Sequence, residues 1–504
     1  MGPKTTRKWK MENKKNISPN IPEADGQKRA HQEAVIGPDL TRDDAKEIPL
    51  TKQSRDQIFV NLTGNPFVDA GMWAISGLSG KEKPEDLTRE DLEEAKEKIL
   101  SLYFKDGWKK TLYSVFTTNS RILNPSLDNK KEYRALLEDL LKEIEEMPLQ
   151  NRGSCIGCGR RDFKKRITNT EIPLTGSGAN LNYFSYLVRG ADYCPACTFS
   201  IQFSPLLMYW TPWNKHTLLF LHSQSEKVMK YGIRKPIRDI EQQILTKNYS
   251  GCCNKGIKNP VNALFDIVLD ILRYTEERWQ DEKPAIQFYH FTNFGQSPSL
   301  EVYSLPDDAF RFLALVKRHE MYNEWQKVVK KGYRNVNWDK VKEEKDYVNK
   351  MNKVFQNLLN GKSIVTFFFD SKKREVYGNW ELLSYYLLEV RNMDKERIET
   401  IKEVGDKIAN YIKESGDIKR LDRLERTDTY RGFRNQLRII IRDRVAANYD
   451  DILFDFDEYV NHLVPDYKEW RETQDLLLFR IYEQLYDWLL KVDKENEKEK
   501  EVNE

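Results

Sequence analysis

The chain has few of the residues that mark secreted or membrane proteins. Only six of its 504 residues are cysteine, and four of these form two CxxC pairs, which is not the pattern of a disulfide framework. No run approaches the roughly eighteen consecutive apolar residues that a membrane-spanning helix needs. The N-terminus has no hydrophobic segment like that of a signal peptide. These absences predict a cytoplasmic protein.

The sequence also lacks the short motifs of common enzyme classes. It contains no HExxH motif and no His-Asp dipeptide, and its six histidines are scattered without metal-ligand spacing. Gly361-Lys362-Ser363 looks like the end of a phosphate-binding loop, but Gln356 stands where the first glycine of that motif belongs. We therefore expect that the chain is not an enzyme.

The most specific motif is a pair of CxxC sequences, Cys155-Ile156-Gly157-Cys158 and Cys194-Pro195-Ala196-Cys197. A two-residue spacer lets both sulfurs of a pair reach one ion, and four thiolates satisfy the tetrahedral preference of Zn²⁺. We predict one structural zinc ion bound by Cys155, Cys158, Cys194 and Cys197, because four protein ligands leave no position for water. The alternatives are a thioredoxin-like redox pair and incidental buried cysteines. Cys252-Cys253 is predicted to be a pair of buried free thiols.

Positive charge is concentrated around these cysteines. Residues 151–260 contain 16 Lys and Arg against 6 Asp and Glu, although the whole chain carries a net charge of only +3. Such a local excess predicts contact with a polyanion, and coverage by acidic neighbours elsewhere in the fold is the alternative. A later stretch places Arg431, Arg434, Arg438 and Arg442 on one stripe of a helix. The predicted nucleic-acid contacts in these stretches are Arg160, Arg161, Lys164, Lys165, Arg166, Arg234, Lys235, Arg431, Arg434 and Arg438.

The hydrophobic pattern predicts a multidomain α+β protein. Its mixed N-terminal domain carries an inserted four-cysteine, zinc-ribbon-like module, and a helical bundle forms the C-terminal part. The predicted divisions are a disordered segment or extension (1–57), an N-terminal α+β domain (58–150), a basic zinc-binding module (151–260), an α+β body (261–375), a C-terminal helical bundle (376–491) and a charged tail (492–504).

Several individual elements follow from local signals. Apolar residues predict strands at 58–62 and 363–370, and two further strands at 285–291 and 300–305 that form a hairpin. Thr88-Arg89-Glu90-Asp91 has the pattern of a capping box and predicts the start of a helix. Asp69 is the predicted cap of an earlier helix that contains Met72, Ile75 and Leu78.

Four features taken together resemble the CXXC–CXXC family of CRISPR-associated proteins, the large subunits of type I (I-A and I-B-like) Cascade interference complexes. They are the two CxxC pairs, the segment Asn61-Leu62-Thr63-Gly64-Asn65-Pro66-Phe67-Val68-Asp69-Ala70-Gly71, the segment Thr117-Thr118-Asn119-Ser120, and the segment Tyr430-Arg431-Gly432-Phe433-Arg434. The resemblance spans residues 58 to 490.

The resemblance implies a non-catalytic subunit that binds target double-stranded DNA, recognises the protospacer-adjacent motif and helps to recruit a helicase–nuclease in antiviral defence. The implied partners are guide RNA, target DNA, the Cascade backbone subunits and the helicase–nuclease. The C-terminal bundle resembles the region that lies along the displaced DNA strand in related systems.

Related subunits read the motif with short loops, for which the candidates in this chain are Gly64, Asn65, Asn119, Arg121 and Asn124. The alternatives to this function are a stand-alone zinc-ribbon enzyme acting on nucleic acid, such as a nuclease, and an architectural zinc protein.

Overall fold

The computed structural model describes residues 57–175, 181–182, 188–213, 216–273, 279, 283–295, 298–465 and 468–503. The contacts between Cα atoms divide the chain after Pro49, and all of these ranges belong to the unit Leu50–Glu504. The predicted disordered segment or extension lies outside the described residues except for Gln57. The described fold is mixed helix and sheet, as the sequence predicts. None of the described helices carries an apolar stretch long enough to span a bilayer.

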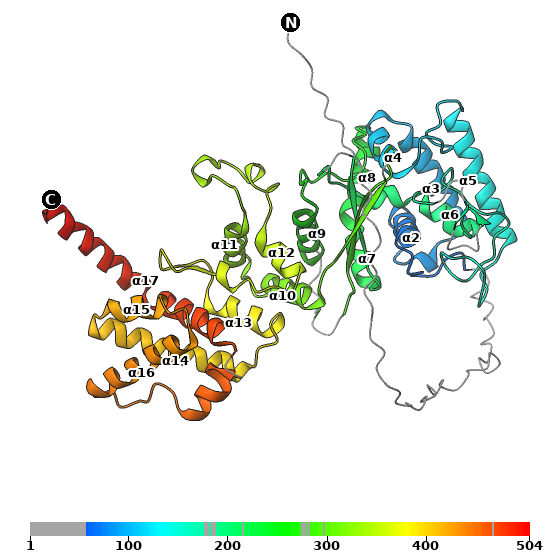
Figure 1. Cartoon of the computed structure of the whole chain (residues 1–504). Helices are drawn as coiled ribbons and strands as arrows, with labels where there is room; N and C mark the ends of the chain where they lie inside the picture. The colour runs from blue at the N-terminus through cyan, green and yellow to red at the C-terminus, as the bar shows by residue number, and fades with distance from the viewer. Residues whose placement is uncertain are drawn as a thin grey trace, which may run out of the picture. The chain divides into compact units, whose positions relative to one another are not determined.

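The N-terminal region is mainly helical, with α2 (Pro66–Leu78), α3 (Arg89–Tyr103), α4 (Lys109–Val115) and α5 (Asn129–Glu146). These helices are labelled in Figure 1. The predicted capping box of α3 is confirmed, since Thr88 and Asp91 exchange backbone and side-chain hydrogen bonds. The predicted strand at 58–62 is wrong, because these residues are irregular and join no sheet.

Helix α2 begins earlier than the sequence suggests. Asn65 is its N-cap and accepts hydrogen bonds from the amides of Phe67 and Val68, while Pro66 occupies the first helical position. The prediction of Asp69 as the cap is therefore wrong. Asp69 lies in the first turn of the helix, where its carboxylate binds the preceding loop instead.

A four-stranded antiparallel sheet follows, in the order β3 (Tyr209–Trp210), β4 (Leu218–His222), β5 (Gln287–Thr292) and β6 (Ser299–Ser304). The predicted hairpin of the last two strands is confirmed. Every residue of β4 is buried, and its side chains alternate between two hydrophobic cores. Leu218 and Phe220 face the core that contains α2, whereas Leu219 and Leu221 face the core that contains α9 (Pro260–Arg273).

This sheet combines strands from the predicted zinc module with strands from the predicted α+β body, and the domain boundaries stay predictions. Other elements of this part are the two-residue strands β1 (Leu181–Asn182) and β2 (Val188–Arg189) and the helices α6 (Pro195–Ile201), α7 (Glu226–Gly232), α8 (Arg234–Thr246), α10 (Asp307–Arg318), α11 (Tyr322–Gly332) and α12 (Lys353–Leu359).

The strand predicted at 363–370 is also wrong. Val365–Phe367 forms a 3₁₀ turn, and only Phe369–Asp370 (β7) pairs, with Glu375–Val376 (β8). A short apolar run is equally compatible with any buried backbone, so its composition did not determine its conformation.

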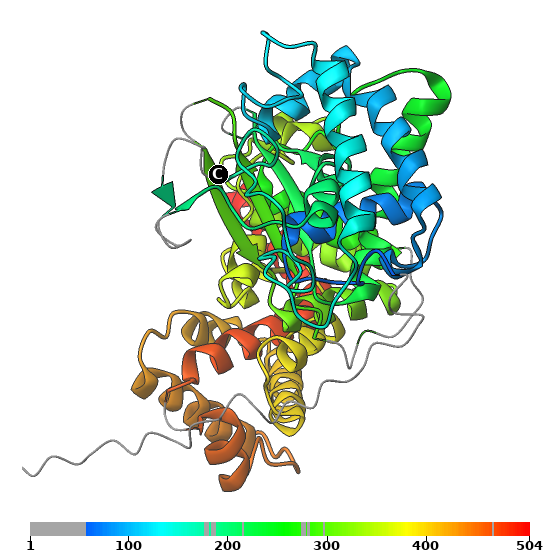
Figure 2. The same ribbon diagram turned by 90° about the vertical axis from the view of Figure 1, so that its right-hand side faces the viewer.

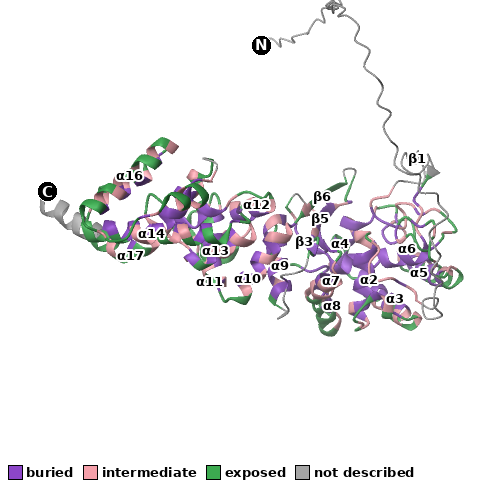
Figure 3. Cartoon of the chain, turned by 90° about the horizontal axis from the view of Figure 1, so that it is seen from below, coloured by how far each residue is buried: buried purple, intermediate pink, exposed green. Residues whose placement is uncertain are grey.

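Helices make up almost all of the C-terminal region, as predicted. They are α13 (Trp380–Glu389), α14 (Lys395–Ser415), α15 (Ile418–Glu425), α16 (Tyr430–Ala446) and α17 (Trp470–Asn503). Helices α14 and α17 pack against each other and are the yellow and red-orange helices of Figure 2. The backbone of α17 remains helical through the predicted charged tail as far as Asn503. Figure 3 shows buried residues concentrated where these helices meet.

Helices α2 and α6 approach so closely that only glycine fits at their contact. A Cβ atom built on Gly71 of α2 would lie 1.8 Å from the carbonyl oxygen of Ser200 in α6. The two helices are therefore in backbone contact, and any larger residue at position 71 must force them apart.

We expect Gly71→Ala to lower the free energy of unfolding by at least about 2 kcal/mol, although alanine is the better helix former. Urea denaturation of the two proteins measures this loss. Gly432→Ala in α16 is the control, because its new Cβ would meet only side-chain atoms of Thr429 and Thr427, at 3.0 and 3.1 Å. An equal effect of the two substitutions would show that the contact between α2 and α6 is not tight.

Candidate metal centre

The four cysteines of the CxxC pairs converge on one point. Their sulfur atoms all lie within 4.8 Å of one another, and the Sγ atoms of Cys158 and Cys194 are 3.9 Å apart. A tetrahedral zinc ion with Zn–S bonds of about 2.3 Å requires sulfurs about 3.8 Å apart. The donor set and its spacing therefore fit a structural zinc ion, and the predicted ligands come together as expected.

Backbone amides point at these sulfurs. The amides of Gly157 and Cys194 donate to Cys155 Sγ at 3.3 and 3.2 Å, and the amide of Arg160 donates to Cys158 Sγ at 3.4 Å. The amide of Cys197 donates to Cys194 Sγ at 3.4 Å. Such hydrogen bonds favour the thiolate form, which is the form that binds metal.

Local backbone features hold the two pairs in place. Cys194 is the N-cap of α6, and Pro195 takes the first helical position, so the second pair occupies the first turn of a helix. Gly159 has a φ of +64°, which closes the turn after the first pair. A Cβ atom on Gly157 would lie 3.0 Å from both Cys197 Sγ and the ring of Tyr193, so a larger residue there would require these side chains to shift.

The other two cysteines behave differently. Cys252 and Cys253 are buried and form no disulfide, as predicted for free thiols. Burial raises the pKa of Cys252 to about 12, so this thiol stays protonated. In the CxxC cluster, hydrogen bonds from the neighbouring thiols, first of all Cys158, lower the pKa of Cys155, whereas the contacts with Cys155 raise the pKa of Cys194 and of Cys197.

Arg161 is a correction to the predicted nucleic-acid contacts. Its side chain is only 2% exposed, and its guanidinium donates to the backbone carbonyls of Met147, Ile58 and Gln57. Burial lowers the pKa of Arg161, whereas the nearby cysteines raise it. Arg161 therefore ties the zinc segment to the start of the described chain and does not face solvent.

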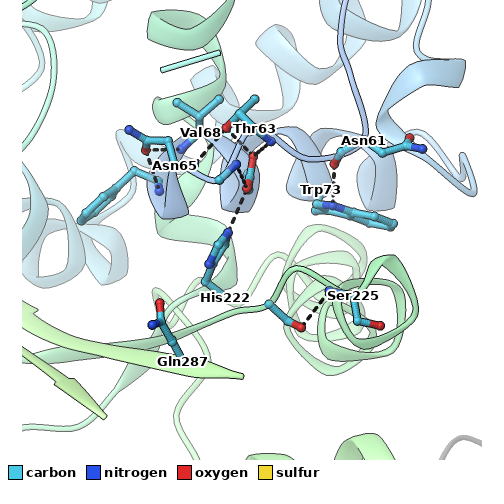
Figure 4. A network of polar contacts seen from close by, with 12 residues as sticks. Asn61, Thr63, Asn65, Val68, Trp73, His222, Ser225 and Gln287 are labelled. Atoms are coloured by element: carbon cyan, nitrogen blue, oxygen red, sulfur yellow. Dashed lines mark hydrogen bonds and ion pairs between the residues drawn. The ribbon is translucent and has the colours of Figure 1, made fainter. Parts of the chain in front are cut away.

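The predicted loop at Gly64 and Asn65 is held by the buried carboxylate of Asp69. Figure 4 shows Thr63 and Asn65 in this loop and His222 on the facing strand. This carboxylate accepts hydrogen bonds from the amide and hydroxyl of Thr63 at 2.7 and 2.6 Å and from the amide of Gly64 at 3.0 Å. His222 Nε2, at the end of β4, lies 2.8 Å from the same carboxylate. The loop is thereby fixed to both α2 and the sheet.

Both ends of the Asn65 side-chain amide form hydrogen bonds. Its oxygen caps α2, and its Nδ2 donates to the hydroxyl of Tyr193 at 2.9 Å, directly before Cys194. Gly64, with a φ of +83°, is exposed and has no atom within 4 Å of where a Cβ would stand. The backbone of Gly64 is thus exposed to solvent at the tip of this loop, while Asn65 joins the loop to the cysteine segment through Tyr193.

The second predicted loop also contacts the cysteine segment. The hydroxyl of Thr117 donates to the carbonyl of Asn169 at 2.8 Å, and the amide of Arg121 donates to the carbonyl of Thr170 at 3.3 Å. The side chain of Asn129 holds the carbonyls of Arg121 and Asn124 at 3.1 and 2.8 Å. Asn119, also in this loop, is exposed.

The predicted basic residues divide into paired and unpaired cations. Lys164 pairs with Glu146, Arg166 with Asp192 at 3.1 Å, and Lys235 with Asp239, while Arg234 lies over the ring of Tyr231. Within the described ranges, the side chains of Arg121, Arg160 and Lys165 form no hydrogen bond or ion pair. Arg152, which the sequence analysis missed, is also exposed and, among the described residues, has no such contact.

The arginines of α16 border a groove of about 820 Å³. Arg431, Arg434 and Arg438 are exposed on its helical wall, as the stripe predicted. The opposite wall is the segment Phe454–Tyr459, in which the ring of Phe456 is 78% exposed. Sequence reasoning missed Phe456, because an aromatic residue between helices carries no signal of its exposure.

A comparison with protein families identifies the cysteine segment. Residues 149–209 match the family CRISPR-associated protein (Cas_CXXC_CXXC), and the matched segment contains all four converging cysteines. The resemblance to a CXXC–CXXC family of CRISPR-associated proteins is confirmed for this segment, and the type I Cascade role stays a prediction. No curated protein and no solved structure matches the chain.

We expect one zinc ion per chain in the purified protein, measured by inductively coupled plasma mass spectrometry. Replacing Cys155 and Cys194 by serine should remove the metal and lower the free energy of unfolding by more than about 4 kcal/mol. The reason is that the two CxxC pairs would no longer be joined by one metal ion. Cys252→Ser is the matched control and should keep the metal. A metal-free wild-type protein would rule out the zinc site.

Proposed function

We propose that this chain, whose residues 149–209 match a CRISPR-associated family, is the non-catalytic large subunit of a type I Cascade effector complex. In this role it binds target double-stranded DNA, recognises the protospacer-adjacent motif and helps to recruit the helicase–nuclease that cuts. Guide RNA on the backbone subunits reads the target sequence by base pairing, so the protein reads only a short flanking motif.

One observation carries this proposal: both predicted reading loops are hydrogen-bonded to the segment that holds the metal centre. Asn65 contacts Tyr193 just before α6, and the loop at Arg121 contacts Thr170. The next residue, Glu171, accepts a hydrogen bond from Gln202 at the end of α6. Helix α6 has seven residues and is about 10 Å long, so the two attachments lie near opposite ends of one short helix.

The unpaired cations support phosphate binding beside these loops. Arg160 follows the first CxxC pair, Lys165 lies in the same loop, and Arg121 lies in the second reading loop. Because described acidic groups do not neutralise them, these side chains remain available to replace the counterions of a nucleic acid. Phosphate contacts set position and affinity, while the exposed Gly64 backbone and Asn119 side chain supply contacts to base edges.

The groove beside α16 suits the displaced DNA strand. From Arg431 to Arg438 the helix rises about 10 Å, which spaces three guanidinium groups along a phosphate backbone. The exposed ring of Phe456 on the other wall offers a surface on which an unpaired base can stack. Duplex bases are already stacked and paired, so this combination favours a single strand.

We expect Arg160→Glu combined with Lys165→Glu to weaken duplex DNA binding at least about tenfold, whatever the flanking motif. The slope of log K for DNA binding against log salt concentration should decrease in magnitude by about two, because two phosphate contacts are lost. Lys372→Glu combined with Lys373→Glu changes the charge equally at an exposed turn elsewhere and is the control. Unchanged affinity of the first variant for duplex DNA would show that the cysteine segment is not part of the DNA interface.

The same preparations test the absence of catalysis. Incubation of the wild-type protein with labelled DNA and RNA in magnesium or manganese should leave both substrates intact. Cleavage that co-purifies with the chain, and that disappears with its Cys155→Ser variant, would favour a zinc-ribbon nuclease instead.

We expect Phe456→Ala to weaken binding of single-stranded DNA by about 1–3 kcal/mol while leaving duplex binding unchanged. Fluorescence anisotropy with labelled oligonucleotides measures both. Leu245→Ala removes a comparably exposed apolar side chain on α8 and is the control. Equal losses for single strands and duplexes would contradict stacking in the groove.

A further inference from the structure

The groove beside α16 has one basic wall and one acidic wall. Arg431, Arg434 and Arg438 line it on the helix, and Asp455 lines it on the opposite side. The chain on that side is acidic, because residues 445–465 include five Asp and Glu and no Lys or Arg. Among the described residues, no ion pair joins Asp455 to the three arginines. The two walls are thus held apart, and the volume between them is open to a ligand.

Asp455 is held in a fixed orientation by backbone hydrogen bonds. Its Oδ1 accepts from the amide of Glu458 at 2.7 Å, and its own amide donates to the Glu458 carboxylate at 2.8 Å. This reciprocal pair has the pattern of a capping box and stiffens the turn at Phe456. The other carboxylate oxygen, Oδ2, forms no hydrogen bond or ion pair within the described ranges. Asp455 therefore places a free acceptor in the groove, directly beside the exposed ring of Phe456.

The charge of Asp455 opposes the binding of a phosphate backbone. A carboxylate in such a groove lowers the affinity for every nucleic acid unless it contacts a group other than phosphate. The capping hydrogen bond does not require this charge, because asparagine is an equally good acceptor at such a position. Bases supply the missing contact, since an ionised carboxylate only accepts hydrogen bonds and several bases donate them.

Guanine fits this acceptor better than the other bases. Its Watson–Crick edge carries two adjacent donors, N1–H and the N2 amino group, which can both point at one carboxylate. Cytosine and adenine place an acceptor nitrogen beside their amino group, and thymine places its single N–H between two carbonyl oxygens, so each of them repels a carboxylate. In a duplex the donors of guanine are already paired, and only an unpaired strand offers them.

We infer that the groove beside α16 selects guanine in a single strand. The base stacks on the ring of Phe456, and its N1–H and N2 amino group donate to the carboxylate of Asp455. The three arginines of α16 contact the phosphates of the same strand, which by themselves carry no sequence information. Asp455 thereby determines base preference at the strand site that the proposed function assigns to this groove, on which this inference rests.

Binding of three labelled oligonucleotides to the full chain tests the inference. Each is a single strand of thymines with one central guanine, hypoxanthine or thymine (the guanine, hypoxanthine and thymine strands). Hypoxanthine differs from guanine only by lacking the N2 amino group. We expect the wild-type protein to bind the guanine strand at least about threefold more tightly than the hypoxanthine strand, and at least about tenfold more tightly than the thymine strand, in fluorescence anisotropy.

Asp455→Asn is the decisive variant, because asparagine keeps the oxygen that accepts from Glu458 and removes the charge. Its melting temperature should equal that of the wild type. We expect it to bind the guanine strand at least about threefold more weakly and the thymine strand no more weakly, because a repulsion of phosphates is lost as well. Asp457→Asn removes an exposed charge two residues further on and is the matched control, which should affect both strands alike.

The outcomes separate the two proposals. If the wild-type chain binds none of the three strands, the groove is not a strand site, and that part of the proposed function fails together with the inference. If the wild-type chain binds all three strands equally, the strand site stands and the selection of guanine is wrong. If Asp455→Asn changes the affinities for the guanine and thymine strands by the same factor, or changes neither, Asp455 makes no contact with the base and the inference is overturned.

Discussion

The arrangement depends on one constraint, the convergence of four cysteine sulfur atoms on one point where they can hold a single metal ion. The first CxxC pair lies in an irregular turn, and the second begins helix α6, so neither pair alone fixes the other. A metal ion at this point would join them, because its positive charge would be shared by all four thiolates. Helix α6 then contacts α2 through backbone at Gly71, and α2 carries the loop at Gly64 on its N-terminus. A metal contact is thus linked to a loop about 130 residues earlier in the chain through two tightly packed helices.

Polar contacts complete this linkage. The buried Asp69 carboxylate gathers three donors from the loop before α2 and meets His222 from the sheet. A buried carboxylate with satisfied hydrogen bonds holds its partners firmly, because losing any of them leaves a buried acceptor without its donor. The loop is therefore ordered before any ligand arrives, which lowers the entropic cost of binding. Under the proposed function, such preordered loops beside unpaired cations would combine phosphate contacts with contacts to base edges.

Much of this could be predicted from the sequence, for identifiable reasons. The metal ligands follow from spacing alone, and the α3 capping box and the β5–β6 hairpin follow from local patterns that need no tertiary information. The strands expected at 58–62 and 363–370 did not form, because short apolar runs show burial but not conformation. The burial of Arg161 was equally invisible, since a charge cluster in sequence does not show which member turns inward to hold backbone carbonyls. The exposure of Phe456 depends on what surrounds it in space.

The measurement that tests the central constraint most directly is zinc K-edge X-ray absorption on the purified protein. Four sulfur scatterers at about 2.3 Å, with no nitrogen or oxygen in the coordination shell, are expected if Cys155, Cys158, Cys194 and Cys197 bind the ion together. A shell with fewer than four sulfurs, or one completed by nitrogen or oxygen ligands, would contradict the metal centre on which the linkage to the loops at Gly64 and Arg121 depends.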